Sequence, residues 1–588
     1  MLIKEAAVEI TPSLTKLLNA SMNQETFTTI WKGATDVPLY KKDHANPRTT
    51  HPPVSLLCTL SKVFERIVFK YVYNFFRENF LISIHQFGFL PGHSTVLQLT
   101  EIYHHFCKAV SDGKEIRVVF LDIKKAFDRV WHRGLIFKLE RCGISGKLLH
   151  WFADYLKDRV QRVILKGQYS KWLKIVAGVP QGSVLGPLLF LIFINDLTSV
   201  IDFCDIRMFA DDTSLFITVD NREEAAVSLN HDLANVQTWA DRWLVSFSPP
   251  KSESLIISTK TQLDRHPQLS FMGTPIKEVK EHKHLGITLT QSLRWNKHID
   301  EISNKCTKKL DVMKSLKWKI DRKSLETIFN SFVLPCMDYG DVLYAGTYDS
   351  DLCKLDKILV DAMRIVTGAT ARSNIKLLHE ETGWPTLTER RTKHVLCSFF
   401  KILHDMSPSP ILETYNTLVA REQHYALRNM NHIPAPFTRT ESYRRSYFPD
   451  AIRRWNQLSP TLKENHSFEE FKQLLNMPTI PKQDILYYGD RWASIHHARI
   501  RLGCSKLNSH LCNNLHVIPF STCNCGNEDE TPIHFFFTCP LHNEHRAELH
   551  NTFIHLTTFT LHTVLYGDNT LSLNENKLLF DAVHTFIK

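Results

Sequence analysis

The stretch of the chain that decides the fold is Phe209-Ala210-Asp211-Asp212. Apolar runs of strand length flank it at 205–209 and 213–219, which predicts a tight hairpin with two carboxylates at its tip. An Asp-Asp turn exposed to solvent is the commoner fate of such a pair. Carboxylates between buried strands, however, cost free energy unless a metal, a cation or hydrogen bonds compensate them. A second acidic strand end upstream favours this alternative.

The second acidic strand end is Asp122, which directly follows the apolar run 118–121 and leads into a helix-like stretch. Two strand ends that carry Asp suit a two-metal site, in which oxygen ligands hold two Mg²⁺ ions about 3.5–4 Å apart. Such ions activate a hydroxyl and stabilise a leaving pyrophosphate. Between the acids lies the loop 178–187, which opens an apolar helix at 188–197. We expect backbone donors at this helix start to contact phosphates or a base pair.

The order of these motifs resembles that in the reverse transcriptases of non-LTR retrotransposons, of the jockey or LINE-like kind. The similarity covers about the first two thirds of the chain, from near Trp31 to beyond Gly286. The motifs that carry it are Leu121-Asp122 with Ala126-Phe127-Asp128, then Pro180-Gln181-Gly182-Ser183, then Phe209-Ala210-Asp211-Asp212.

The resemblance implies an α+β right-hand polymerase with fingers, an antiparallel-sheet palm with helices on one face, and a helical thumb. We expect the strands near 159–165 and 172–177 to complete the palm sheet. A mostly helical C-terminal region would end in a small zinc-knuckle-like Cys/His module. The expected bounds are 1–115 for the N-terminal helix and fingers, 116–290 for the palm, 291–420 for the thumb and connector and 421–588 for the C-terminal region, with the whole reverse transcriptase domain at about 25–290.

By the same resemblance, Asp122, Asp211 and Asp212 are the catalytic acids. Asp122 and Asp211 would bind two Mg²⁺ ions, for which Mn²⁺ would substitute, and the carbonyl oxygen of Ile123 would be a further ligand. Lys251 lies in a segment similar to the family's Asn-Pro-x-Lys-Thr-Glu. It would approach the leaving phosphate as a general acid.

Three further residues are implied in nucleotide binding. Phe127 would lie under the sugar of the incoming nucleotide, where its ring excludes a 2′-hydroxyl and favours dNTPs. The alternative for Phe127 is a core aromatic without a role in selection. Gln181 and Gly182 resemble residues that line the nascent base pair.

The fingers segment departs from the family pattern. Lys32, Lys41 and Lys42 would face the incoming triphosphate or the template, and the alternative is a basic surface hairpin. The family's Asn-Tyr-Arg-Pro-Ile-Ser run aligns so that Pro52 replaces its arginine, which would neutralise phosphate charge. Arg48 would substitute if the loop bends back, and otherwise we expect weakened activity.

A basic run follows the predicted palm. Such a run is usually a solvated helix face, but after a polymerase palm it suits a template–primer duplex, whose affinity should fall steeply with salt. The nucleic-acid-binding lysines predicted here are Lys305, Lys308, Lys309, Lys314 and Lys317.

The C-terminal part has a motif of its own, with the spacing C-x-C-x₈-H-x₄-C. Three Cys and one His suit a closed tetrahedral Zn²⁺ site of structural type, and similar Cys/His tails end many retrotransposon polymerases. The alternative is free Cys near a His-rich surface. Upstream, Arg499, Arg501 and Lys506 could supply phosphate contacts. The candidate zinc ligands are Cys523, Cys525, His534 and Cys539.

Bulk composition sets the class of protein. The 588 residues are 43% hydrophobic with a net charge of +10, which predicts several packed units and suits a polyanionic partner. Thirteen Cys without a signal segment favour an intracellular protein of cytoplasm and nucleus. The longest apolar run, 184–194, is too short to cross a membrane. We find no room for the endonuclease that such elements usually encode, so a truncated element is expected.

The predicted function is an RNA-directed DNA polymerase that extends a primer 3′-hydroxyl with dNTPs on an RNA template. Its partners would be the RNA template, a DNA primer and the element RNA, in a ribonucleoprotein. One alternative is an inactive relic that only binds nucleic acid, as Pro52 suggests. Another is an RNA-dependent RNA polymerase, against which Ala210 and Phe127 argue.

Overall fold

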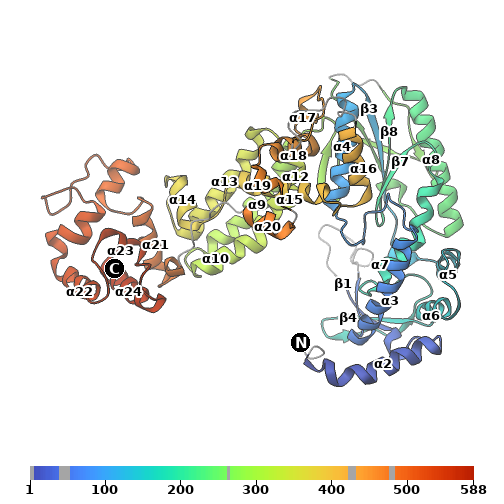
Figure 1. The fold of residues 1–588 in the computed structure, drawn as a ribbon, viewed down its shortest axis with the longest axis horizontal. Coiled ribbons are helices and arrows are strands. Elements are labelled where there is room, and N and C mark those ends of the chain that lie inside the picture. Colours follow the sequence, from blue (N-terminus) through green and yellow to red (C-terminus); the bar gives the residue numbers. More distant parts are fainter. Residues whose placement is uncertain (1–4, 39–52, 261–264, 421–431, 466, 476–483) are drawn as a thin grey trace. The chain divides into compact units, whose positions relative to one another are not determined.

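The computed structural model describes residues 5–38, 53–260, 265–420, 432–465, 467–475 and 484–588 (Figure 1). The described chain forms two compact units. The first contains the residues up to Leu293, together with 405–420 and 438–443. The second contains 294–404, 432–437 and 444–588.

A five-stranded sheet is the centre of the first unit. Its strand order is β12-β9-β3-β8-β7, and all neighbours are antiparallel except β12 and β9. Every residue of β3 is buried, and the strand is rich in β-branched and aromatic side chains that suit a central position. The strands are β3 (Glu115–Leu121), β7 (Asp205–Phe209), β8 (Asp212–Val219), β9 (Glu253–Ile257) and β12 (Lys277–Val279).

Helices cover both faces of this sheet, so the expectation of helices on one face is wrong. Successive strand residues point to opposite faces. Phe216 lies 5.4 Å, ring to ring, from Phe106 of α4 (Thr95–Ser111). The preceding Leu215 belongs to the same core cluster as residues of α8 (Arg222–Trp243). Figure 1 shows α4 and α8 on either side of β3 and β8.

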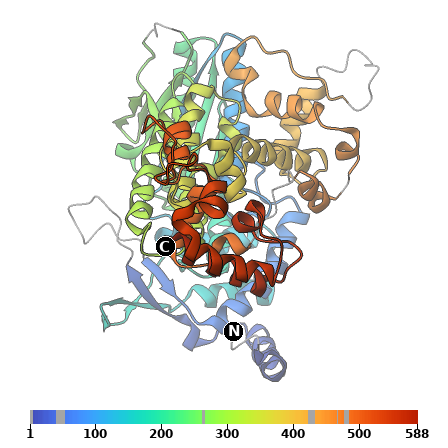
Figure 2. The ribbon, with the colours of Figure 1, turned by 90° about the vertical axis from the view of Figure 1, so that its left-hand side faces the viewer.

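A second sheet in this unit holds the strands that were expected to complete the first, and that expectation is also wrong. Its order is β2-β1-β4-β5, with β6 paired to β4 and with β1 parallel to β4 (Figure 2). In β4, partly buried and exposed residues alternate, which suits a solvated sheet better than the fully buried central one. The strands are β1 (Gly33–Pro38), β2 (Pro53–Leu56), β4 (Val160–Leu165), β5 (Gln168–Tyr169) and β6 (Leu173–Lys174).

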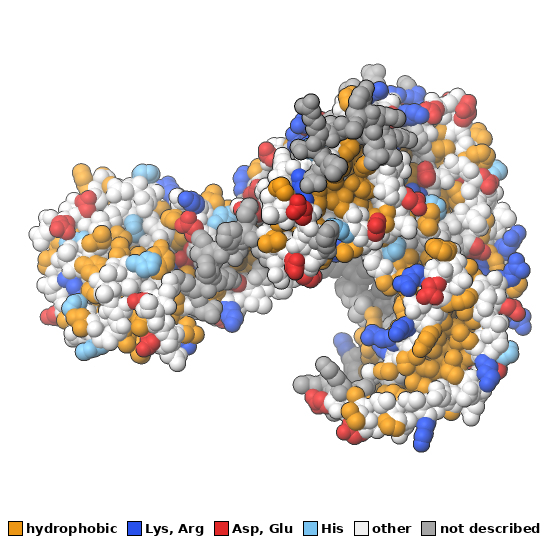
Figure 3. All heavy atoms as spheres, in the orientation of Figure 1, with side chains coloured by type: hydrophobic (Ala, Val, Ile, Leu, Met, Phe, Trp, Pro, Cys, Tyr) orange, Lys and Arg blue, Asp and Glu red, His pale blue; other side chains and the backbone are white. Residues whose placement is uncertain are grey.

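Helices and short hairpins complete the first unit. A groove lined by Leu18, Met22, Ile67 and Tyr71 lies between α2 and α3, where apolar side chains gather on the surface (Figure 3). The remaining elements are α2 (Ala7–Asn23), α3 (Thr59–Glu78), α5 (His132–Arg141), α6 (Gly146–Leu156), α7 (Leu185–Ile194), α16 (Ser409–Ala420), β10 (Ser270–Phe271), β11 (Thr274–Pro275), β13 (Glu281–His284) and β14 (Ile287–Thr290).

The second unit is helical in its described part. Its α9 packs along α13, and Arg322 and Arg501 both pair with the buried carboxylate of Glu381, at 2.7 and 2.8 Å. The predicted phosphate contact of Arg501 is therefore wrong, because its guanidinium is used in the interior. The principal helices are α9 (Asn296–Leu316), α10 (Arg322–Ile328), α13 (Asp349–Thr367), α14 (Ile375–Thr382), α15 (Leu387–Leu403), α18 (Tyr447–Asn456), α20 (Phe468–Leu474), α21 (Arg491–Arg501), α22 (Asn543–Ile554), α23 (Leu561–Tyr566) and α24 (Leu573–Ile587).

The length and polarity of a helix decide whether it could span a membrane. None of the helices in the described ranges combines enough length with enough apolar character to cross a bilayer.

Candidate active site

The acidic hairpin forms as the sequence predicts. Phe209 pairs with Asp212 across the turn between β7 and β8, and Ala210 takes a left-handed conformation with φ of 54°. On the other side of β8, Leu121 pairs with Thr213. This register brings the end of β3, and with it Asp122, to the same edge of the sheet as the hairpin tip.

The hairpin tip is held by the loop that contains Gln86 and Gly88. The side-chain oxygen Oε1 of Gln86 accepts hydrogen bonds from the backbone N–H of Ala210 at 2.9 Å and of Gly88 at 2.7 Å. A Cβ atom on Gly88 would lie 2.2 Å from the nitrogen of Ala210, so only glycine fits there. Gln86 directly precedes Phe87-Gly88-Phe89 and is buried, and a buried amide needs hydrogen-bond partners.

The three acids influence one another electrostatically. Burial raises the pKa of Asp212 to about 6, and the charges of Asp211 and Asp122 add to the increase. Burial also raises the pKa of Asp211, with a further contribution from Asp122. The ionised forms are therefore strained by desolvation and by mutual repulsion.

This donor set fits a hard divalent cation such as Mg²⁺. Carboxylate oxygens are its preferred ligands, and a dication would relieve the repulsion that raises both pKa values. Among the described residues, the three carboxylates do not all lie within 4.8 Å of one another, so the fit depends on their chemistry and common location.

Lys251 lies beside these acids. Residues 122–124 pair with 246–248, since Ser248 N–H donates to the Asp122 carbonyl and Lys124 N–H to the Ser246 carbonyl, each at 2.7 Å. Ile123 and Phe247 form the bridge between them. The segment that follows places Nζ of Lys251 3.5 Å from Oδ2 of Asp122. Lys251, the predicted general acid, is thus next to a predicted metal ligand.

Phe127 is partly buried under the sheet edge. Its ring stacks on Phe190 of α7 at 4.9 Å and meets Phe89 edge-on at 5.8 Å. The Phe127 carbonyl oxygen accepts a hydrogen bond from Val179 N–H at 2.8 Å, which joins the turn after Asp122 to the segment before Pro180. These contacts fix the ring without choosing between a core role and a role in sugar selection.

Gln181 and Gly182 lie against β2 and the turn after Asp122. Ser55 N–H donates to the Gln181 carbonyl at 2.9 Å, and Gln181 Nε2 donates to Asp128 Oδ1 at 3.3 Å. Gly182 has a φ of 113°, and a Cβ there would lie 2.8 Å from the Ser55 carbonyl oxygen. The adjoining cavity of about 330 Å³ is lined in part by Asp36, Ser55, Lys125, Asp128, Arg159, Gln161 and Gln181.

The start of α7 does not offer its backbone donors to a ligand, which corrects the expectation for this helix. Oε2 of the buried Glu65 accepts from Val184 N–H at 2.8 Å and from Leu185 N–H at 3.2 Å. Ser183 Oγ accepts from Gly186 N–H at 2.9 Å. The helix is capped from within the protein.

The fingers lysines divide into two groups. Lys32 is buried, and its ammonium pairs with Asp154 at 2.9 Å, so its predicted role at the triphosphate is wrong. The sequence offered no local sign of a partner 122 residues away. Lys41, Lys42, Arg48 and Pro52 lie outside the described residues.

Comparison with known proteins shows what this region is similar to. Residues 39–289 match the family described as "Reverse transcriptase (RNA-dependent DNA polymerase)". The region that carries the acidic hairpin is therefore similar to reverse transcriptase domains.

The chain has curated relatives in insects. The probable RNA-directed DNA polymerase from transposon BS of Drosophila melanogaster is 30% identical over 396 residues, which cover 65% of this chain and 43% of the relative. The RNA-directed DNA polymerase from mobile element jockey of the same species is 30% identical over 388 residues, covering 64% and 42%. The chain thus spans less than half the length of these relatives.

Among solved structures, telomerase from Candida albicans in complex with a telomeric RNA fragment is 12% identical. The TM-score is 0.30, and the match covers 70% of this chain and 68% of telomerase.

Beyond residues 39–289, the predicted lysines of α9 differ in their surroundings. Lys305 and Lys308 are exposed. Lys309 lies 4.1 Å from the ring centre of Phe332, and Lys314 pairs with Asp311 at 3.1 Å. Lys317, at the end of the helix, is half-buried.

The four predicted zinc ligands come together in the second unit. Cys523, Cys525, His534 and Cys539 each present a ligand atom within 4.8 Å of the other three. Cys523 and Cys539 lie 3.7 Å apart, sulfur to sulfur, and Cys525 Sγ lies 3.2 Å from His534 Nε2. The other ring nitrogen of the histidine, Nδ1, lies 3.0 Å from Glu528 Oε2, which leaves Nε2 for a metal.

The chemistry of this cluster fits Zn²⁺. Backbone hydrogen bonding from Asn527, followed by the neighbouring His534 and Cys523, lowers the pKa of the Cys525 thiol to about 7. A thiol that ionises readily is a good zinc ligand. Glu528 and Thr538, which fix the histidine ring, were not predicted from the sequence.

Proposed function

We propose that the chain is an RNA-directed DNA polymerase of a non-LTR retrotransposon, which extends a primer 3′-hydroxyl with dNTPs on an RNA template. The observation that carries the proposal is the meeting of Asp122, Asp211 and Asp212 at one sheet edge inside the region similar to reverse transcriptase domains. The finer architecture would be that of a right hand, with the five-stranded sheet as palm, the β1–β4 sheet in the fingers and α9 in the thumb.

Asp122 and Asp211, with the carbonyl of Ile123, are the proposed ligands of two Mg²⁺ ions, and Asp212 lies beside them. When bound, these ions activate the primer hydroxyl and neutralise charge on the leaving pyrophosphate. Lys251, at 3.5 Å from Asp122, donates a proton to that pyrophosphate as general acid. Its exposed side chain leaves the ammonium accessible to a ligand.

Residues near the acidic sheet edge would select the nucleotide. The Phe127 ring, fixed by Phe190 and Phe89, would exclude a 2′-hydroxyl. Gln181 and Gly182 would support the nascent base pair. The close approach of Gly182 to Ser55 means that any side chain there would displace the neighbouring strand.

The Cys/His cluster is proposed to hold a structural Zn²⁺ through Cys523, Cys525, His534 and Cys539. Four protein ligands leave no open position for catalysis, so the ion would stabilise the fold. The element RNA, bound as a ribonucleoprotein, is the proposed source of template.

The experiment that tests the polymerase is primer extension on an RNA template with Mg²⁺ and dNTPs. The Asp211→Asn, Asp212→Asn double variant removes both charges at constant volume. Asp241→Asn, on the exposed face of α8, is the matched control. We expect incorporation by the parent and the control, and at least about a hundredfold loss in the double variant.

A second candidate function is an inactive relic that binds nucleic acid. It is favoured by Pro52, which stands where the family carries an arginine. Salt-dependent template binding by the parent without any incorporation would establish it. Incorporation of rNTPs in preference to dNTPs would instead indicate an RNA polymerase.

A further inference from the structure

A basic and aromatic surface lies in the second unit and includes none of the residues of the proposed catalytic site. It joins the end of α9 to α21, and we call it the Trp318–Trp492 patch. Trp318 and Trp492 are exposed, at 54% and 42% of their surface. The members of the patch are Lys317, Trp318, Arg491, Trp492, His496 and Arg499.

Three cations of the patch crowd one another. Burial lowers the pKa of Lys317, and the charges of Arg499 and Arg491 lower it further. Burial and the charge of Arg322 lower the pKa of Arg491 to about 10, although Asp321 opposes the shift. Within the described ranges no carboxylate forms an ion pair with any of these three cations, in contrast to Arg322 and Arg501, which share Glu381. The patch therefore carries uncompensated positive charge.

Backbone contacts explain how the two arginines are held. Arg491 Nε donates to the Lys317 carbonyl at 2.8 Å, and its Nη2 donates to the Ile365 carbonyl at 2.9 Å. Arg499 Nε donates to the Gly368 carbonyl at 2.9 Å. These carbonyls belong to the C-terminal ends of α9 and α13, where partial negative charge favours cations. Capping of helix ends thus accounts for Nε and Nη2 of Arg491 and for Nε of Arg499.

Helix capping does not account for the two exposed indole rings. Arg499 lies 6.0 Å from the ring centre of Trp318, and Lys317 Nζ lies 5.7 Å from it. On α21, Trp492 stacks on His496 with ring centres 3.9 Å apart, and Arg499 lies about two turns after Trp492. Flat rings interleaved with cations are the arrangement that binds single strands, because phosphates pair with the cations while bases stack on the rings.

We propose that the Trp318–Trp492 patch binds single-stranded nucleic acid, with phosphates at Lys317 and Arg499 and bases stacked on Trp318 and Trp492. The patch shares no residue with the acidic edge, so binding to it can be measured in a variant that lacks the acids. RNA and single-stranded DNA have the same phosphates and stackable bases, so the experiment compares both.

The test is fluorescence anisotropy of the full chain with labelled oligo(rU), oligo(dT) and a duplex, each about 15 nucleotides long. The variants are Trp318→Ala with Trp492→Ala, and Arg499→Gln. The matched controls are Phe520→Ala, at an aromatic exposed by 75%, and Lys357→Gln, on the exposed face of α13.

We expect the tryptophan pair to weaken single-strand binding about tenfold or more, and Arg499→Gln to reduce the slope of log affinity against log salt by about 0.7. The controls and the Asp211→Asn, Asp212→Asn variant should bind like the parent. Trp318→Tyr with Trp492→Tyr should retain most of the affinity, because tyrosine rings still stack on bases. A preference for oligo(rU) over oligo(dT), or the reverse, names the natural strand.

Unchanged affinity in the tryptophan pair, or an equal loss in Phe520→Ala, would overturn the proposal. An equal loss of duplex binding would also overturn it, since the patch would then follow a double helix. Photocrosslinking of thiouridine-labelled RNA to the unsubstituted chain supplies a test that needs no variant. Crosslinked peptides must include 317–318 or 491–499, and crosslinks found only elsewhere would reject the site.

Discussion

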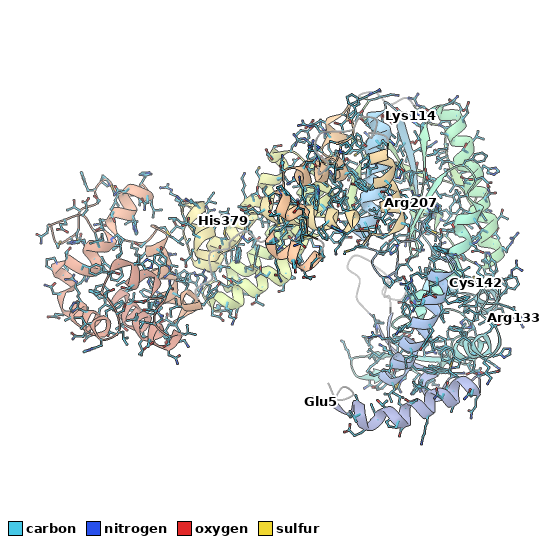
Figure 4. All side chains as sticks on the ribbon, viewed as in Figure 1. Glu5, Lys114, Arg133, Cys142, Arg207 and His379 are labelled. Atoms are coloured by element: carbon cyan, nitrogen blue, oxygen red, sulfur yellow. The ribbon has the colours of Figure 1, made fainter. Side chains whose placement is uncertain are left out.

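Two groups of carboxylates in the first unit have pKa values that are shifted in opposite directions. Glu101 of α4 accepts from Arg207 of β7, whose position Figure 4 marks. Burial alone raises the pKa of Glu101, but the hydrogen bond from His105 and the charge of Arg207 outweigh it and lower the pKa to about 2. At the tip of the same hairpin, the pKa of Asp212 rises to about 6.

The difference lies in the counter-charge. Glu101 has a cation built into the fold, whereas the acids at the sheet edge have mainly one another and the exposed Lys251. In the first group, the fold itself supplies the positive charge that balances the carboxylate. In the second group, an external cation would have to supply this positive charge, as the proposed metal-dependent polymerase requires.

The largest effect that would sharpen this contrast is on activity. Asp211→Asn with Asp212→Asn should abolish primer extension, by about 10²–10³-fold or more, without lowering the thermal unfolding temperature, because it removes repelling charges. Extension assays and calorimetry on the same preparations check this. A marked fall in unfolding temperature would mean that the acids are part of the folding core.

The opposite result is expected at the completed group. Glu101→Gln should lower the free energy of unfolding by about 3–5 kcal/mol, because it removes the nearer of two carboxylates from the buried Arg207 and leaves only Asp205, at 3.7 Å, among the described residues. Urea unfolding measures the change, with the exposed pair residue Glu78→Gln as control. Equal stability of Glu101→Gln and the parent would break the comparison.

A smaller effect is expected where the hairpin tip is held. Gln86→Leu removes the oxygen that accepts from Ala210 and Gly88, and leaves two buried N–H groups without it. The free energy of unfolding should fall by about 2 kcal/mol, and extension should weaken because the acids lose their support. Urea unfolding and extension kinetics measure both effects in Gln86→Leu and in Gln86→Glu, which keeps an acceptor oxygen and should be affected less. Full activity in the leucine variant would show that the loop is not a support.

The smallest effect is a difference in pH dependence without divalent cations. The pKa of Glu101 is lowered, so its stabilisation is present above about pH 4.5 and is lost as the pH falls toward 2. The pKa of Asp212 is raised, so its penalty is present above about pH 6 and disappears as the pH falls toward 3.8. Unfolding of the parent, Glu101→Gln and Asp212→Asn across pH 3–7 should show opposite slopes relative to the parent. Slopes of the same sign would contradict the comparison.

The sequence predicted those parts of the structure whose cause is local. The hairpin 205–219 follows from two apolar runs around two acids, and the Cys/His cluster follows from ligand spacing. The strand 160–165 was placed in the wrong sheet, because local alternation shows that a strand exists but does not name its partner. Lys32 and Arg501 were misread for a similar reason, since Asp154 and Glu381 lie more than a hundred residues away.

The candidate site shows the same limit. Its acids were predicted from strand ends, but the Gln86 support and the Glu65 cap of α7 were not. Each contact is made by one buried polar side chain to a backbone N–H more than a hundred residues away. The residues around Gln86 and Glu65 in the sequence do not indicate these distant partners.

The pairing of 122–124 with 246–248 has a mechanical consequence. Asp122 and the backbone that leads to Lys251 are joined by direct hydrogen bonds, so they move as one body during any rearrangement of the surrounding loops. The backbone hydrogen bonds therefore hold the main chain of Asp122, a proposed metal ligand, close to the main chain that leads to Lys251, a proposed proton donor. Nucleotide entry could shift Gln181 or β2 without changing the distance between these two main-chain segments.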